Sequence, residues 1–175
     1  MAYRVDLSKT APEILINRIN YVFGTSYTAD QLTFDSRGAV PLSKEEARRE
    51  GVESKAAAYY KQGFTGSQNF MFTRGDLNKL LKGVVVPVPI GAVKWSQDLA
   101  PYIFDELGVN INPHQIMIEP IPEDATEFTV RLIPRHLSLK GTIAIEFVDP
   151  TPRKLKELVT KTELDGFSFP GEING

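Results

Sequence analysis

Large apolar residues recur with helical spacing in two segments that lie 84 residues apart. Each segment carries three of them at i, i+4 and i+8: Leu15, Ile19 and Phe23 in the first, and Leu99, Ile103 and Leu107 in the second. This spacing forms one apolar stripe along a helix. A glycine follows each stripe, Gly24 and Gly108, and a glycine at that point ends a helix in the left-handed conformation. The pattern predicts two amphipathic helices with the same stop signal.

Both predicted helices also have start signals. Thr10-Ala11-Pro12-Glu13 is a capping box with proline in the first turn, so the first helix should begin just after Thr10. Ser96 is expected to cap the second helix, and Asp98 lies favourably near its positive end.

Strand patterns follow each helix. Residues 66–72 and 141–147 both begin with glycine and end with large apolar residues at alternate positions, as in a half-buried strand. Residues 127–133 alternate in the same way. Residues 54–60 have the intrinsic propensity of a helix, but their place in the repeat predicts a strand.

Short helices complete the pattern. One is expected over residues 76–81 and another over residues 152–159, after the cap at Thr151. The segment from Ser43 to Gly51 opens with a second capping box. It has no counterpart in the other copy, so it should form a short projecting helix.

These elements predict an α+β fold built from two divergent tandem repeats, each reading helix–strand–strand–strand–short helix. A unit this small cannot cover both faces of its sheet, so the two copies should pack together. The expected organisation is a first repeat, a proline-rich connector, a second repeat and an extended C-terminal tail, over residues 1–83, 84–95, 96–160 and 161–175 respectively.

Composition narrows the function. The 175 residues include no cysteine, which excludes disulfides and thiolate chemistry, and the formal net charge is −2. Direct binding to nucleic acid is not expected, because phosphate binding usually needs a basic excess. Residues 1–87 are net positive and residues 88–175 net negative. This asymmetry is either chance or a sign that opposite halves of neighbouring subunits meet.

The sequence predicts a protein without a membrane span or secretory signal. The longest apolar run, residues 83–90, is interrupted by two prolines and is far shorter than the roughly 20 residues that cross a bilayer. The first residues contain no apolar segment of the signal-peptide kind. Synthesis in the cytoplasm is therefore expected.

Residues that could carry chemistry are few. His114 and His136 are the only histidines and lack a third ligand at metal spacing, so both are expected to be loop residues without a special role. Neighbouring acidic pairs should be solvated, because adjacent helical side chains diverge by about 100°; they are Glu45-Glu46, Asp105-Glu106 and Glu123-Asp124. No nucleophile elbow or phosphate-binding loop occurs. We expect no enzyme activity, cofactor or metal.

Two further features bear on recognition. Arg74-Gly75-Asp76 spells an integrin-binding tripeptide, but Asp76 stands where the next helix needs a cap, and capping is the favoured interpretation. The candidate assembly contacts are large or rigid apolar residues: Trp95, Leu164, Phe167, Phe169 and Pro170. Trp95 either packs on its own helix or contacts a partner. The tail residues must lie on this domain or on another subunit, because a segment so rich in glycine cannot form its own core.

Several short motifs occur in order along nearly the whole chain. They are Gly63-Phe64-Thr65-Gly66-Ser67, then Phe72-Thr73-Arg74-Gly75-Asp76-Leu77, then the helix and strand of residues 99–118, and finally Leu164-Asp165-Gly166-Phe167-Ser168-Phe169-Pro170. This order resembles a family of uncharacterised virion proteins of large tailed bacteriophages. Gly75 stands where that family more usually has an apolar residue, and His114 where it has aspartate.

The resemblance implies a structural role in the phage particle: head surface, neck, tail or baseplate. Its partners would be other virion proteins, in many copies of a symmetric assembly, and its location the virion. Two alternatives remain. The chain could be a virion binding module for carbohydrate or protein of the host surface, or an assembly chaperone that is absent from the finished particle.

Overall fold

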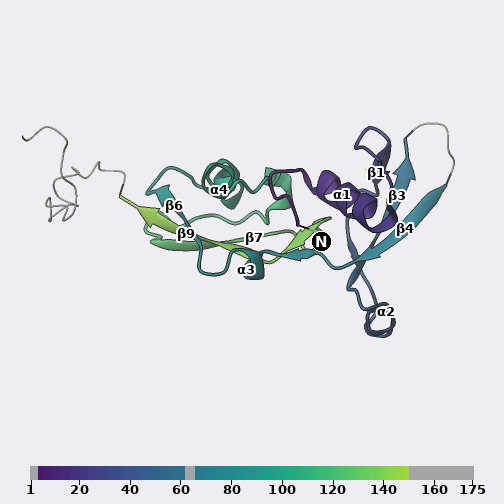
Figure 1. Ribbon diagram of the computed structural model, residues 1–175. Coiled ribbons are helices and arrows are strands. Elements are labelled where there is room, and N and C mark those ends of the chain that lie inside the picture. The colour runs from purple at the N-terminus through teal and green to yellow at the C-terminus, as the bar shows by residue number, and fades with distance from the viewer. Residues whose placement is uncertain (1–3, 62–65, 150–175) are drawn as a thin grey trace, which may run out of the picture.

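The computed structural model describes residues 4–61 and 66–149 and shows an elongated α+β protein (Figure 1). The predicted fold class is confirmed. The helices are α1 (Ala11–Phe23), α2 (Lys44–Glu50), α3 (Leu77–Leu80) and α4 (Ala100–Leu107), with the 3-10 helices η1 (Ser96–Leu99) and η2 (Pro113–Gln115). The strands are β1 (Leu32–Phe34), β2 (Val40–Pro41), β3 (Ser54–Tyr60), β4 (Ser67–Phe72), β5 (Gly75–Asp76), β6 (Val85–Pro89), β7 (Glu127–Arg131), β8 (Leu139–Lys140) and β9 (Thr142–Val148).

One end of the molecule is built on strand β3. Strand β4 pairs antiparallel with one edge of β3, while β1 and β2 share the other edge. Helix α1 covers one face of this sheet (Figure 1). Ala56 and Ala58 are buried in β3, and small side chains at these positions leave room for α1. The strand predicted for residues 54–60 is confirmed, because sheet pairing and burial override helix propensity.

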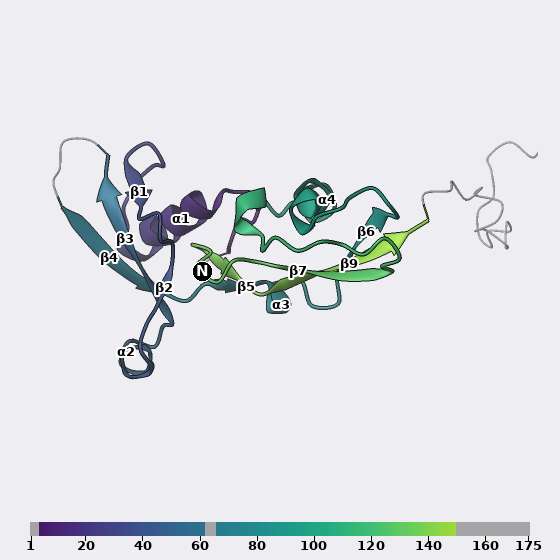
Figure 2. The same cartoon turned by 180° about the vertical axis from the view of Figure 1, so that it is seen from behind.

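The opposite end is built on strand β9, which lies between β6 and β7. Strand β6 runs parallel to β9 and β7 runs antiparallel to it. Helix α4 covers this sheet on the same side of the molecule as α1 covers the other (Figures 1 and 2). Ile103 of α4, Val88 of β6 and Ile145 of β9 belong to one buried core.

The two ends share parts of each other's cores. Leu77, at the start of α3, is fully buried in the core beneath α4, whereas Leu137 belongs to the core beneath α1. Strand β5 also pairs with β8, in parallel. The predicted boundary between residues 83 and 96 therefore does not separate two independent cores.

The predicted helix ends are confirmed, with one correction. Gly24 and Gly108 both have φ of 64°, and the backbone N–H of Thr10 donates to the Glu13 carboxylate at 2.9 Å. Ser96, however, is not the cap of the second helix. It is buried as the first residue of η1, where its hydroxyl donates to the Met117 carbonyl at 2.6 Å.

Further elements match the sequence pattern. The inserted helix α2 has the Ser43 cap, whose hydroxyl accepts from the Glu46 N–H at 3.2 Å. Gly66 and Gly141 precede β4 and β9 with positive φ of 111° and 105°. The predicted helix over residues 152–159 and the tail lie outside the described residues.

The proline-rich connector needs correction. Residues 85–89 form strand β6, with Val86 and Val88 fully buried. Proline is tolerated there because β6 is an edge strand, which needs only one set of ladder hydrogen bonds. The segment between the two predicted repeats is thus part of the second sheet.

Candidate interaction surfaces

The residues considered for catalysis and metal binding do not converge. His114 is exposed in η2, whereas Glu45 is exposed in α2, Asp105 in α4 and Glu123 in a turn. Within residues 4–61 and 66–149, no group of three potential ligands could hold a metal ion.

His136 lies in a loop, as expected, but it is almost completely buried. Its Nδ1 accepts the Leu139 N–H at 3.1 Å, which holds the turn leading into β8. Its Nε2 has no hydrogen-bond partner among the described residues. Burial, with a smaller contribution from the positive charge of Arg74, lowers the pKa of His136 from 6.5 to about 4. The ring is therefore neutral at pH 7.

The Arg74-Gly75-Asp76 tripeptide is occupied by internal contacts. Arg74 is mostly buried, pairs with Glu53 at 3.2 Å and donates to the Pro134 carbonyl at 2.7 Å. The Gly75 N–H donates to the Ser138 carbonyl at 2.9 Å. The Asp76 carboxylate accepts the Asn78 N–H at 3.1 Å, as a helix cap does.

Glu53 is the centre of this junction between the two ends. It pairs with Lys140 as well as with Arg74. Burial acts to raise the pKa of Glu53, but the hydrogen bonds from Lys140 and Arg74 and the charge of Lys140 outweigh it, so that the pKa lies below its usual value. The cluster ties Lys140 of β8 to Glu53, the residue that precedes β3.

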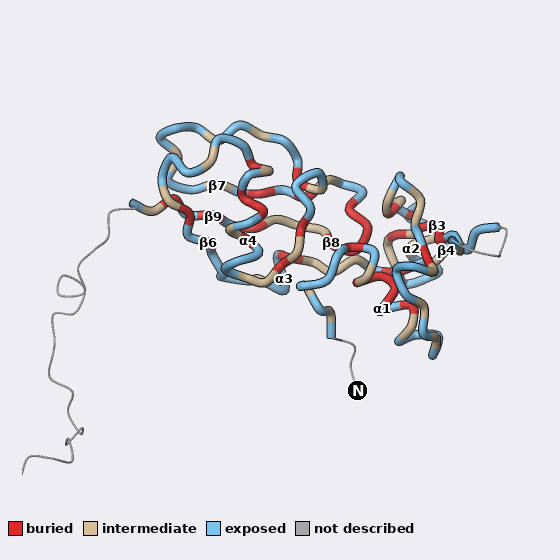
Figure 3. Tube along the Cα trace, turned by 90° about the horizontal axis from the view of Figure 1, so that it is seen from above, coloured by how far each residue is buried: buried red, intermediate tan, exposed pale blue. Residues whose placement is uncertain are grey.

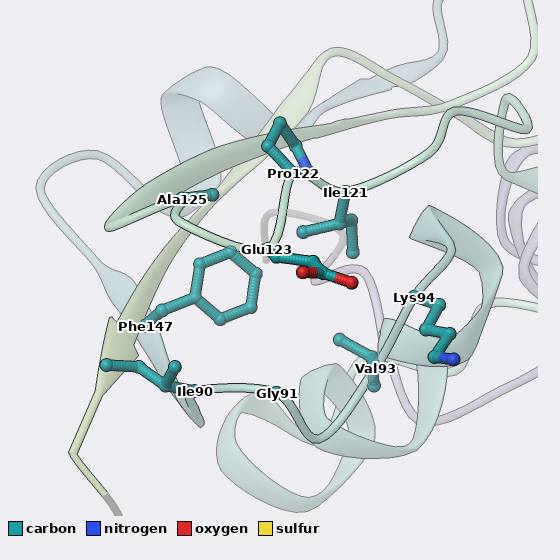
Figure 4. Close-up of a pocket in the computed structure, with 9 residues that line it drawn as sticks. All are labelled: Ile90, Gly91, Val93, Lys94, Ile121, Pro122, Glu123, Ala125 and Phe147. Carbon is teal, nitrogen blue, oxygen red and sulfur yellow. The ribbon is translucent and has the colours of Figure 1, made fainter.

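A cavity of about 280 Å³ lies at the β9 end of the molecule (Figure 4). Its lining is mostly apolar and includes Ile90, Val93, Ile121 and Phe147. Lys94 and Glu123 are the charged side chains at its wall. Apart from these two charged groups, the side chains that line the cavity are apolar and include no nucleophile. The cavity therefore suits the apolar part of a ligand.

A second hollow is an apolar groove between α1 and β4, at the other end of the molecule. Its volume is about 380 Å³. Helix α1 and strand β4 supply its main apolar lining: Leu15, Ile19, Val22, Phe23, Phe70 and Phe72. A smaller hollow of about 100 Å³ continues it, because both share Leu15, Arg18, Phe72 and Thr73. Hereafter the two together are called the α1/β4 groove.

The rim of the α1/β4 groove exposes large apolar side chains. Val22, Phe23 and Met71 are 56%, 63% and 48% exposed. The Phe23 ring stacks edge-on against Phe70, with centroids 5.9 Å apart. Tyr21 is exposed beside them. Large contiguous apolar patches of this kind mark binding surfaces in soluble proteins.

Of the five candidate assembly contacts predicted from the sequence, only Trp95 lies among the residues that the structure describes. Trp95 is 48% exposed, just before η1, so about half of the residue remains accessible to a partner. Leu164, Phe167, Phe169 and Pro170 lie outside the described residues.

The α1/β4 groove was not predicted from the sequence, although one signal was present. Tyr21 and Val22 occupy the helical positions that Asp105 and Glu106 occupy in the second helix. An apolar stripe that is wider on one of two similar helices indicates a further contact. No described helix is long and apolar enough to cross a membrane.

The model of a family of unknown function, DUF7941, matches residues 4–174. No curated protein and no solved structure matches the chain.

Proposed function

The chain belongs to this family of unknown function, and we propose that it is a structural subunit that acts by assembling with other subunits in the particle of a tailed phage. The observation that carries the proposal is the exposed apolar rim of the α1/β4 groove beside the open edge of β4. In the described part of the chain, no strand pairs with the outer edge of β4.

An open strand edge flanked by apolar side chains favours association. Proteins that act as monomers usually protect such edges with charges, prolines or a covering element. In β4 the residues nearest the exposed end are Ser67, Gln68 and Asn69, which are uncharged. A subunit that is covered by its neighbours needs no such protection. The resemblance to virion proteins is the reason to expect the assembly to be a phage particle. The α1/β4 groove is the surface through which the subunit would contact its neighbours.

The direct test is mass spectrometry of purified phage particles whose genome encodes this chain. We expect the protein in the particle at a fixed copy number, and the symmetry of that number would indicate head, neck, tail or baseplate. In parallel, sedimentation of the purified chain should show association that increases with concentration. A chain that is absent from particles and stays monomeric would overturn the proposal.

A further inference from the structure

The second sheet shows what could occupy the α1/β4 groove. Strand β9 has β7 on one edge and β6 on the other. Strand β4 has β3 on one edge and, among the described residues, no strand on the other. The place that β6 takes beside β9 therefore corresponds to the outer edge of β4, and β4 lines the α1/β4 groove.

The correspondence can be traced residue by residue. Gly66 and Gly141 precede β4 and β9 with similar backbone conformations. Four and six residues beyond each glycine stand Phe70 and Phe72 in β4, and Ile145 and Phe147 in β9. In the second sheet, Val86 of β6 lies beside Ile145 and Val88 beside Phe147. An added strand should thus place apolar residues beside Phe70 and Phe72, two positions apart.

Burial agrees with a missing strand. Ile145, which β6 covers, is 1% exposed, whereas Phe70 is only half-buried. Figure 3 shows exposed residues at the end of the molecule that carries β4.

We propose that residues 167–170 of a second copy add to the edge of β4 as a parallel strand, with Phe167 beside Phe70 and Phe169 beside Phe72. This inference rests on the proposed assembly function and names its contact. Main-chain hydrogen bonds to the open edge would give affinity, and the groove would take the alternate side chains, as in other cases of strand addition.

The sequence of the tail fits this place. Val86-Pro87-Val88-Pro89 of β6 and Phe167-Ser168-Phe169-Pro170 of the tail share the order apolar, any residue, apolar, proline. Phenylalanine is larger than valine, and the groove has about 380 Å³ to fill.

A second copy is the favoured donor because of where β9 ends. The last described strand ends at the opposite end of the elongated molecule from β4 (Figures 1 and 2). A tail that leaves one end and binds the other end of a neighbour generates a head-to-tail contact, which closes into a ring or continues as a filament. The residues just before α1 are poor occupants, because Arg4, at the position matching buried Val88, is exposed.

Cysteine cross-linking tests the register directly, since the natural chain has no cysteine. In the proposed pairing Ser168 lies beside Met71, as Pro87 lies beside Glu146. Cα atoms of neighbouring strands are about 4.8 Å apart, within the range of a disulfide. Full-length M71C and S168C proteins, one isotope-labelled, are mixed at high concentration and mildly oxidised. The control replaces S168C with N174C, which is shifted by about 20 Å along an extended chain.

We expect a covalent dimer joining positions 71 and 168 to form at least about tenfold faster than the control dimer. Equal rates would overturn the register and the contact. The M71C/S168C double variant is oxidised at low concentration as well. A monomer with an internal disulfide would show that the tail closes its own groove, which overturns the second copy as donor.

Substitutions in the tail give an independent measurement. F169A should weaken self-association of the full-length protein by about 10- to 100-fold, because it removes one buried aromatic side chain. I173A, the apolar control beyond the strand, should change it by less than about threefold, because Ile173 lies outside the proposed contact. If the wild-type protein associates but F169A and I173A behave alike, this contact is wrong and the proposed function stands. If the wild-type protein neither associates nor enters particles, the proposed function itself fails.

Discussion

The two ends of the molecule have similar strand pairings. They differ in that β9 has a strand on each edge, whereas β4 has a described strand on one edge only. Leu32 of β1 lies opposite Tyr60 of β3, and Ile116 forms the corresponding bridge with Leu132. Both helices end at a left-handed glycine. The core beneath α4, however, contains the buried strand β6, whereas the core beneath α1 is smaller and rich in alanine. The first end therefore has, among the described residues, no strand beside β4 at the position that β6 takes beside β9.

The tandem repeat stays a prediction, and the pairings refine it. They make Tyr60 equivalent to Leu132, an offset of 72 residues. The sequence pattern aligns Ser54 with Glu127, an offset of 73. Alternation alone cannot set this register in an alanine-rich strand, because small side chains on both faces look alike.

The largest effect on stability should come from truncating a side chain in the core beneath α4. Ile103 is 0% exposed beneath α4, so I103A should lower the free energy of unfolding by about 2–5 kcal/mol through the cavity it leaves. I19A, at the matching position beside the open groove, should cost less, because that site can relax. Urea unfolding of both variants measures the difference. A cost below about 1 kcal/mol for I103A would remove Ile103 from the core, and equal costs would weaken the comparison.

Acidification should destabilise the junction between the ends. The folded pKa of His136 is lowered to about 4, below the unfolded value near 6.5, so the unfolded chain binds more protons between these values. Stability due to the neutral ring is complete above about pH 6.5 and is lost as the pH falls toward 4, by roughly 3 kcal/mol.

H136N provides the matched control for this pH dependence. Asparagine can still accept the Leu139 N–H but does not titrate. The difference between wild type and H136N in urea-unfolding free energy should change across pH 6.5 to 4 and be flat above it. A difference that is constant with pH would mean that His136 is not buried in the folded protein.

A smaller effect is expected at the cap of α3, close to the junction. D76A should reduce stability by about 0.5–2 kcal/mol, because the Asn78 N–H loses its acceptor. D76S should be nearly silent, since serine also caps. Thermal melting compares the two. If both variants kept full stability but abolished attachment to cells, the tripeptide would be a recognition motif instead.

The smallest stability effect should come from the tail. Deleting residues 162–175 should leave melting of the isolated subunit almost unchanged, while reducing its incorporation into particles. The reason is that residues 167–170 are proposed to bind a second copy and not the subunit that carries them. A large fall in melting temperature would show that the tail belongs to the subunit's own core, and the assembly interpretation would lose its main support.

Local sequence by itself determined the helix ends and several strand starts. The glycines at 24 and 108 and the capping boxes at Thr10 and Ser43 act within one turn, so neighbouring residues suffice to predict them. The apolar stripe of each helix likewise identified core residues such as Ile19 and Ile103.

Only the tertiary structure decided the features that depend on distant neighbours. Residues 85–89 became a strand because the edge of β9 lies beside them, and Ser96 became a buried link because the Met117 carbonyl approaches it. His136 is buried in a loop whose Pro134 and Arg135 carbonyls accept hydrogen bonds from Arg74 and from the Ala39 N–H. The α1/β4 groove exists because nothing in the described chain fills the edge of β4. Such contacts join residues far apart in sequence, and the energy that selects them comes from burial and sheet pairing, which a local pattern does not contain.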